Sequence, residues 1–229
     1  MAPGYSTLPA DWASAILGRG FDLRSLYANV DAIYGALGSL GMVSPGQRAD
    51  VFRAFHRTPL TSVRIVIVGE DPYPDPGQAH GLAFSVPSSY SGPRPVSLSR
   101  MYGSLRRDLN IEPTGDDLTS WADRGVLLVN VALTHKVGAR KPDLQLWWSF
   151  TAAVLAVVHD QTRPIAWLAW GDFANNIIDE IPVTNIRHRV FKNAHPRAGR
   201  ANRETLAQRP PFANVSAFLG SDPMVDWSL

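Results

Sequence analysis

The chain has 229 residues, 45% of them hydrophobic, which suits a single domain over residues 1–229 with a sizeable core. It contains no cysteine, which excludes disulfides, thiolate catalysis and cysteine-ligated zinc, so any nucleophile or base is an oxygen or a nitrogen. The formal net charge is only +2. No apolar run approaches the roughly 18 residues that span a bilayer, and the start MAPGYSTLPADW lacks the pattern of a leader, so we expect a cytoplasmic protein without membrane contact. We also expect a monomer.

The first predicted strand covers residues 63–68, VRIVIV. Its nearly continuous β-branched run is typical of a strand buried on both faces of a parallel sheet. A helix is predicted after it, with Ser97 as N-cap. Its apolar residues follow the spacing i, i+3, i+4, i+7 and i+11 and are Leu98, Met101, Tyr102, Leu105 and Leu109.

Further along, strands are predicted at residues 125–133, 164–171 and 187–192, with a helix over 147–158 between the first two. This alternation of strands and helices indicates an α/β fold whose four strands point to one rim of the sheet. Polar groups gather at that rim: Asn130 lies within the strand at 125–133, and the residues after the other three strands are Glu70, Asp71, Gly171, Asp172 and His195.

Each of these polar residues has a plain structural alternative, since a lone Asn in a strand is usually a paired core amide and a His before Pro often caps a loop. Ligands of open α/β sheets bind outside the carboxyl ends of the strands. The recurrence of polar groups at that edge therefore favours a convergent site.

Charge is concentrated in residues 187–209, which hold seven basic residues and one acid, while the rest of the chain carries a net −4. A basic segment on a mildly acidic body suits a polyanion bound on one face. A solvated surface loop is the alternative.

Five motifs stand in a fixed order: GEDPYPDPGQAHGLAFSV, PRPVSLSRMYGSL, SWADRGVLLVNVALT, LAWGDFA and AHP. Together they resemble the uracil-DNA glycosylase family, of which this chain looks like a divergent member of the classical uracil-N-glycosylase type. The resemblance covers nearly the whole chain. It implies a three-layer α/β/α single domain with a central, mostly parallel four-stranded sheet, and hydrolysis of uracil from DNA that leaves an abasic site.

The resemblance also implies catalytic roles. Asp71 matches the aspartate that positions the attacking water and places negative charge under the cationic sugar, and His195 matches the histidine that hydrogen-bonds uracil O2. No metal or other cofactor is implied. No lysine is placed as a Schiff-base nucleophile, so we expect a monofunctional enzyme that does not cut the strand.

Recognition requires the base to be flipped out of the helix. By resemblance, Asn130 pairs with uracil N3–H and O4, Phe84 stacks on the base, and Tyr73 excludes the 5-methyl group of thymine. Backbone N–H groups near Glu70 and Asp71 add to the anion site. Phe84 as plain core and Tyr73 as turn packing are the alternatives, and His80 is interpreted as structural. The implied partner is uracil-containing DNA, single- or double-stranded, with free uracil as product.

Three features depart from the family pattern. Glu70 stands where most members have Gln, and a second carboxylate beside Asp71 is expected to perturb ionisation of its neighbour. Pro74 replaces the usual His, which removes a side-chain contact in the loop that carries the water. The segment after His195 reads HPRAGR, without the serine and the leucine wedge of most members.

We expect Ser97, Pro196, Arg197 and Arg200 to contact DNA. Because the wedge is missing, we hypothesise that single-stranded or mismatched substrates are favoured, and that inhibitors which clasp the leucine bind poorly at Gly199. A uracil- or abasic-site DNA-binding module with low turnover is the main alternative function. A metal-dependent hydrolase using Asp71 and His195 is disfavoured, because no clustered ligand spacing is present.

Overall fold

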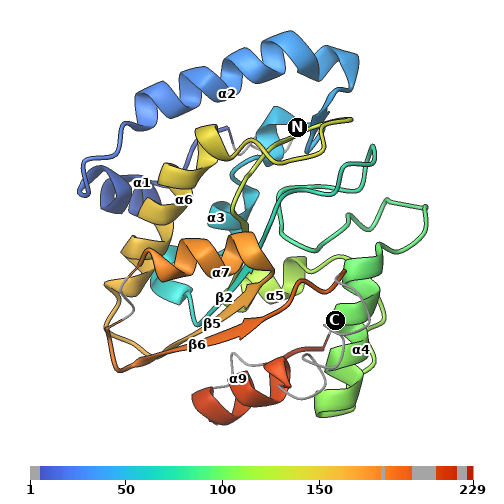
Figure 1. The fold of residues 1–229 in the computed structure, drawn as a ribbon, viewed down its shortest axis with the longest axis vertical. Coiled ribbons are helices and arrows are strands. Elements are labelled where there is room, and N and C mark those ends of the chain that lie inside the picture. The colour runs from blue at the N-terminus through green and yellow to red at the C-terminus, as the bar shows by residue number, and fades with distance from the viewer. Residues whose placement is uncertain (1–5, 182–183, 198–209, 221–225, 229) are drawn as a thin grey trace.

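A computed structural model describes residues 6–181, 184–197, 210–220 and 226–228. At its centre is a four-stranded sheet in the order β3 (Val126–Asn130), β2 (Ile65–Gly69), β5 (Ile165–Trp170) and β6 (His188–Asn193) (Figure 1). All neighbouring strands in it run parallel. The predicted α/β class with a central parallel sheet is therefore confirmed.

Burial explains the apolar sequences of the strands. Every residue of β2, β3 and β5 is buried, which requires the continuous apolar runs seen in the sequence. In the edge strand β6 only the first and last residues are buried. The predicted strand at 125–133 is too long, because β3 ends at Asn130 and the chain then turns, so Asn130 stands at the carboxyl end of its strand.

Helices flank the sheet. On one side, α7 (Asp172–Asp179) packs against β2 and β5, with α6 (Leu144–His159) against α7 and α1 (Ala10–Leu17) against α6. On the other, α9 (Pro211–Leu219) packs against β5 and β6, and α4 (Val96–Leu109) packs against α9. The remaining helices of the described residues are α2 (Leu23–Leu37), α3 (Arg53–Arg57), α5 (Thr119–Asp123) and the 3₁₀ turns η1 (Gly38–Leu40), η2 (Arg48–Asp50) and η3 (Leu60–Ser62).

Helix α4 confirms the predicted apolar stripe, since Leu98, Met101, Tyr102 and Leu105 are all buried. The prediction that Ser97 caps it is wrong. The helix begins at Val96 with Pro95 at the N-cap position and no side-chain cap, so Ser97 lies in the first turn. Its hydroxyl is directed to the Tyr73 hydroxyl instead, at 2.9 Å.

A second, two-stranded sheet was not predicted. In it β1 (Val43–Ser44) pairs antiparallel with β4 (His135–Lys136). Two residues are too few to show the period of a strand in the sequence. As for membranes, none of the helices in the described ranges is long and apolar enough to cross one.

Candidate active site

A cavity of about 500 Å³ opens at the carboxyl edge of the sheet. Its lining comes from the loops after β2, β3 and β6, from the start of α4 and from β4 and the turn that follows it. The lining residues are Glu70, Asp71, Pro72, Tyr73, Pro74, Phe84, Ser97, Asn130, His135, Gly138, Ala139, Arg140, His195 and Arg197.

Most residues predicted for the site therefore meet in one cavity. Pro196 is buried next to it, and its carbonyl accepts a 2.7 Å hydrogen bond from Arg100 Nη1 on α4. Arg200 and Gly199 lie outside the described residues. Asp172, at the start of α7, is exposed and is not among the lining residues.

Asp71 follows β2 by two residues and is held by a histidine from a distant part of the chain. Its Oδ2 lies 2.6 Å from His135 Nδ1. Burial raises the pKa of the Asp71 carboxyl, and the hydrogen bond and charge of His135 act in the opposite direction. The carboxylate is thus partly desolvated, with one of its oxygens fixed.

His195 follows β6 and approaches the backbone of the neighbouring strand β5. A Cβ at Gly171, where φ is +97°, would lie 3.0 Å from His195 Cβ, so only glycine leaves room for the imidazole. The backbone N–H of Arg197 donates to His195 Nδ1 at 3.0 Å. Nδ1 is then unprotonated, so in the neutral ring Nε2 carries the proton.

The pKa of His195 is lowered, mainly by burial and further by the positive charges of Arg197 and Arg100. Both effects favour the neutral imidazole. The ring is therefore set up as a neutral donor through Nε2, with the positive charges of Arg197 and Arg100 acting on it.

Phe84 contributes an aromatic wall in an unusual backbone conformation. Its φ is +64°, a left-handed value that costs a non-glycine residue on the order of 1 kcal/mol or more. The ring packs edge-on against Trp170 with centroids 5.2 Å apart and lies 6.2 Å from the His195 ring. The residue with this strained backbone is thus one whose ring lines the cavity next to the His195 imidazole.

Tyr73 is held rigidly on another wall. Its hydroxyl donates a hydrogen bond to the Phe84 carbonyl at 3.1 Å. Because its single proton is used there, it accepts the hydrogen bond with the Ser97 hydroxyl, which is the donor. Burial raises the pKa of Tyr73, so the phenol stays protonated. Ser97, expected to bind a phosphate, is thereby tied to Tyr73.

Glu70 places a second carboxyl in the cavity. Its pKa is raised by burial first, and then by the charges of Asp71 and Asp172. The sequence led us to expect that Glu70 perturbs the ionisation of Asp71, and this stays a prediction. Of the two carboxyls, Asp71 is the one that lies within hydrogen-bond distance of His135.

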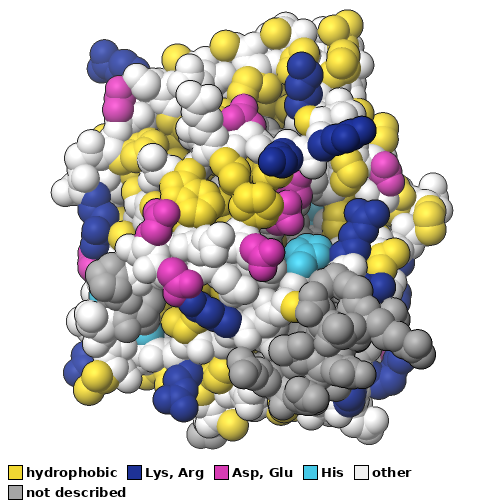
Figure 2. All heavy atoms as spheres, in the orientation of Figure 1, with side chains coloured by type: hydrophobic (Ala, Val, Ile, Leu, Met, Phe, Trp, Pro, Cys, Tyr) yellow, Lys and Arg dark blue, Asp and Glu magenta, His cyan; other side chains and the backbone are white. Residues whose placement is uncertain are grey.

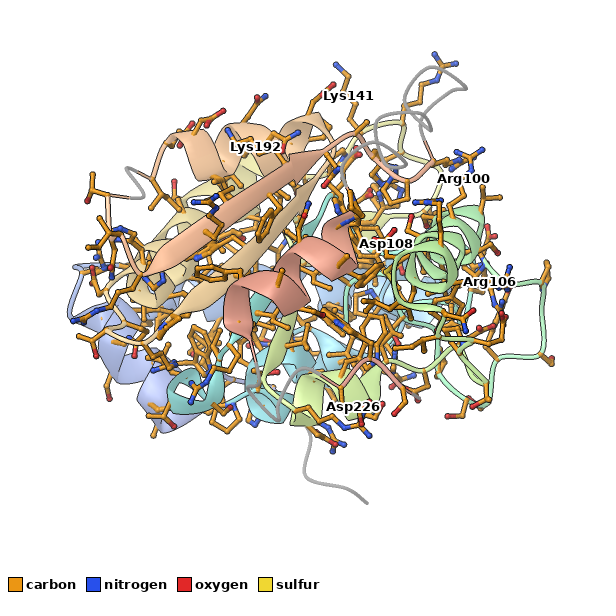
Figure 3. All side chains as sticks on the ribbon, turned by 90° about the horizontal axis from the view of Figure 1, so that it is seen from below. Arg100, Arg106, Asp108, Lys141, Lys192 and Asp226 are labelled. Atoms are coloured by element: carbon orange, nitrogen blue, oxygen red, sulfur yellow. The ribbon has the colours of Figure 1, made fainter. Side chains whose placement is uncertain are left out.

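Basic side chains stand around the cavity. Arg140 and Arg197 line it, and on the face drawn in Figure 2 Lys and Arg side chains lie beside histidine and acidic side chains. Lys141 and Arg100 project from the same side of the molecule (Figure 3). This arrangement suits a polyanion passing over the opening.

Sequence reasoning missed His135 and Arg140. His135 stands five residues after Asn130, so a titratable residue close behind the end of a buried strand was the available signal. For Arg140 there was no signal in the sequence beyond its positive charge. In the described part of the chain, no three His, Asp or Glu side chains cluster as metal ligands would.

The parallel sheet and the cavity at its carboxyl edge define an α/β protein of enzyme type, with a carboxylate and an imidazole in one site. Residues 55–219 match the family model of the uracil DNA glycosylase superfamily. A uracil-DNA glycosylase of Streptococcus pneumoniae is 40% identical over 191 residues, covering 82% of this chain and 84% of that protein. One from Streptococcus suis is 39% identical, covering 79% and 82%. The chain belongs to the uracil DNA glycosylase superfamily and is an enzyme of that class.

Solved structures agree on the fold. A mimivirus UNG variant, Y322L, in complex with UGI superposes with a TM-score of 0.79 at 20% identity, covering 98% of this chain and 90% of that one. The UNG of Nitratifractor salsuginis gives 0.56 at 16% identity, covering 90% and 93%. At these identities the likeness concerns the fold alone.

Proposed function

We propose that this protein is a DNA repair enzyme that hydrolyses the N-glycosidic bond of deoxyuridine in DNA, releasing uracil and leaving an abasic site. The observation that carries the proposal is that Asp71, Asn130 and His195 line one cavity, although they lie at or just after the carboxyl ends of three different strands. Membership of the superfamily and the resemblance of the five motifs support it. We further propose that it acts as a single-domain monomer in the cytoplasm.

In this mechanism Asp71 acts beneath the sugar. As the bond to C1′ breaks, the sugar gains oxocarbenium character, which a nearby carboxylate stabilises. The same carboxylate orients the water that attacks C1′. The partial burial of Asp71 strengthens both effects, because charges interact more strongly where water is excluded.

His195 acts on the departing base. Uracil leaves as an anion with charge on O2, and the Nε2–H of the neutral imidazole donates a hydrogen bond to it. The Arg197 backbone N–H supports this role, since it occupies Nδ1. The neutral imidazole keeps its Nε2 proton and stabilises the anion by hydrogen bonding.

Recognition uses the remaining walls. Asn130 is only 8% exposed, and its side-chain amide pairs with uracil N3–H and O4. Cytosine has an amino group in place of O4, so the amide N–H of Asn130 would face another donor. Phe84 stacks on the base, and the fixed Tyr73 ring occupies the space of a 5-methyl group. Pro196, Arg197, Arg200 and the backbone of Ser97 contact the DNA, and Arg140 joins them at the rim. The Ser97 hydroxyl itself donates to Tyr73.

The direct test incubates the protein with an oligonucleotide that contains one uracil and then cleaves abasic sites with alkali. We expect strand scission only after alkali and only with uracil. Matched oligonucleotides with thymine, cytosine and hypoxanthine serve as controls. Scission without alkali would contradict the monofunctional reaction, and an intact uracil strand would contradict the proposal.

A DNA-binding module with low turnover is the second candidate. It is favoured by the departures from the family pattern at Glu70 and Pro74 and by the arginine-rich segment after His195. Pre-steady-state kinetics separates the two. Multiple turnovers at a constant rate support the enzyme, whereas one burst followed by a stall supports the module.

A further inference from the structure

The Asp71 carboxylate has a partner that the five motifs do not account for. His135 Nδ1 lies 2.6 Å from Asp71 Oδ2, and the His135 side chain is only 8% exposed. The two residues are 64 positions apart in the chain. A short contact between an imidazole and a carboxylate at this depth fixes the carboxyl group, because few other orientations keep the bond.

The chemistry of the pair decides its direction. An ionised carboxylate only accepts hydrogen bonds, so His135 Nδ1 carries the proton and donates a hydrogen bond to Asp71 Oδ2. This engages one carboxylate oxygen and turns the other, Oδ1, into the acceptor that can hold a water. The bond also opposes the rise that burial causes in the pKa of Asp71.

The histidine is itself held by the two-stranded sheet. His135 is paired with Ser44 across the β1–β4 ladder, and Ser44 Oγ donates to the Tyr73 carbonyl at 2.6 Å. The two-stranded sheet thus makes two hydrogen bonds to the loop after β2, one to the Asp71 side chain and one to the Tyr73 backbone. Pro72 and Pro74 have no N–H, so this loop offers fewer hydrogen bonds of its own.

We propose that His135 is a positioning residue, which holds Asp71 in the orientation that directs the attacking water and does so from β4 rather than from the loop itself. The proposal rests on the proposed function and deepens it. The loop position where the resembled family has a histidine is Pro74 here. Pro74 has neither a backbone N–H nor a polar side chain to offer Asp71, whereas His135 lies within hydrogen-bond distance of it.

The test compares His135→Leu, which removes the donor, with His135→Asn, whose amide N–H reaches the same place as Nδ1. Single-turnover cleavage measures the chemical step, and affinity for an oligonucleotide with 2′-fluoro-deoxyuridine, which resists cleavage, measures binding. We expect H135L to slow cleavage by about 10- to 100-fold, the cost of a misplaced group, with affinity nearly unchanged. H135N restores most of the rate.

A double variant separates positioning from packing. On an Asp71→Asn background, H135L should cost little more, because the two residues act as a unit. His188→Leu is the matched control: His188 is also buried but begins β6, at the end of the strand away from His195. It should lower thermal stability and leave the cleavage rate unchanged.

Several results would overturn the proposal. These are a wild-type rate for H135L, equal losses in H135L and H135N, or full additivity with D71N. If H135L does not fold, His135→Ser, too short to reach Asp71, replaces it in the same comparison. If D71N itself cleaves at the wild-type rate, the role of Asp71 in the proposed function fails, which is a different outcome.

Discussion

Gly69 and Asn130 lie opposite each other at the carboxyl ends of β2 and β3, and the missing side chain of one makes room for the other. A Cβ at Gly69 would stand 2.3 Å from Asn130 Oδ1 and 3.1 Å from Phe84 Cε2. The amide and the aromatic ring that are proposed to bind the base therefore both depend on this glycine.

The first prediction follows from that contact. Gly69→Ala should displace the Asn130 amide or the Phe84 ring and weaken binding of free uracil by about tenfold or more, the scale of a lost buried hydrogen bond. Calorimetry with uracil measures it. Gly103→Ala is the control, since a Cβ there, on α4, meets nothing within 4 Å. Uracil affinity at the wild-type level in G69A would contradict the assignment of Asn130.

The second prediction concerns the carboxylate. Asp71→Asn keeps the shape of the side chain but removes its charge, and we expect cleavage to slow by roughly 10²–10³-fold, the scale of one positioned acid–base group. Affinity for uracil-containing DNA should be retained. Single-turnover kinetics and fluorescence anisotropy measure the two effects. Cleavage at an unchanged rate would remove Asp71 from the mechanism.

The third prediction concerns the basic rim. Arg197→Ala and Arg140→Ala should each reduce the slope of log affinity against log salt by up to about 0.9, if each arginine contacts one phosphate. Arg106→Ala is the control, because Arg106 pairs with Glu112 on the exposed side of α4 and does not line the cavity. Slopes equal to wild type would show that the two rim arginines do not contact DNA.

The fourth prediction is a titration. The charge of Arg197 is one cause of the lowered pKa of His195, after burial, so Arg197→Ala should raise that pKa. NMR of ¹⁵N-labelled histidine measures it directly. Arg140→Ala, a cavity residue that is not among the causes, should leave the His195 titration where it is. An equal shift in both variants would contradict a specific effect of Arg197.

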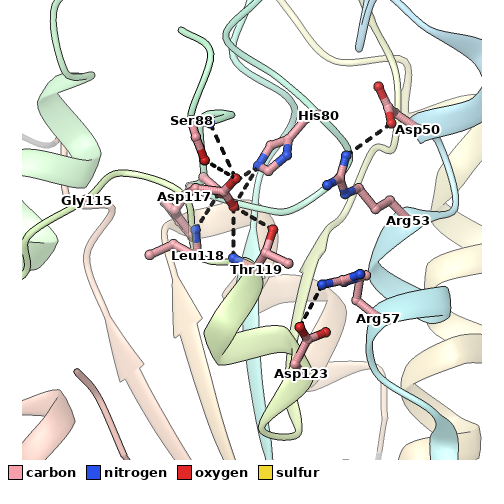
Figure 4. Close-up of polar contacts among 12 residues, drawn as sticks. Asp50, Arg53, Arg57, His80, Ser88, Gly115, Asp117, Leu118, Thr119 and Asp123 are labelled. Atoms are coloured by element: carbon pink, nitrogen blue, oxygen red, sulfur yellow. Dashed lines mark hydrogen bonds and ion pairs between the residues drawn. The ribbon is translucent and has the colours of Figure 1, made fainter. Parts of the chain in front are cut away.

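The fifth prediction concerns stability and pH. His80 is 3% exposed and bonds to Ser85 Oγ at 2.7 Å, in the polar cluster around Asp117 (Figure 4). Burial lowers its pKa to about 4 from an ordinary 6.5, against the opposing charge of Asp117. Between these values the unfolded chain binds the proton and the native one does not. The free energy of unfolding therefore falls as pH drops from 6.5 to 4, by about 3 kcal/mol for a shift of this size.

Urea unfolding of wild type and His80→Gln across this range tests it. The variant should be less stable at pH 7 and should lose part of the pH dependence between 6.5 and 4. His188, whose pKa is also lowered by burial, remains in both proteins and cancels in the difference. Parallel stability curves for the two proteins would contradict the prediction.

Strong local patterns were enough to predict much of this molecule. The β-branched run of β2 and the apolar stripe of α4 identify their elements, because burial on both faces or on one face imposes a period on the sequence. Parallel strands place their carboxyl ends at one edge, so the gathering of Asp71, Asn130 and His195 followed from the order of the strands. The N-cap prediction at Ser97 failed because the helix has Pro95 at the N-cap position, two residues earlier.

By itself, then, the sequence determined the class of fold and the edge of the sheet where polar groups meet. Only the tertiary structure decided that His135 holds Asp71, that Arg197 fixes the tautomer of His195, and that Gly69 makes room for Asn130. The physical reason is the distance along the chain over which each kind of interaction acts. Periodicity and capping act within a few residues, whereas the His135–Asp71 hydrogen bond depends on pairing two-residue strands that leave no pattern in the chain.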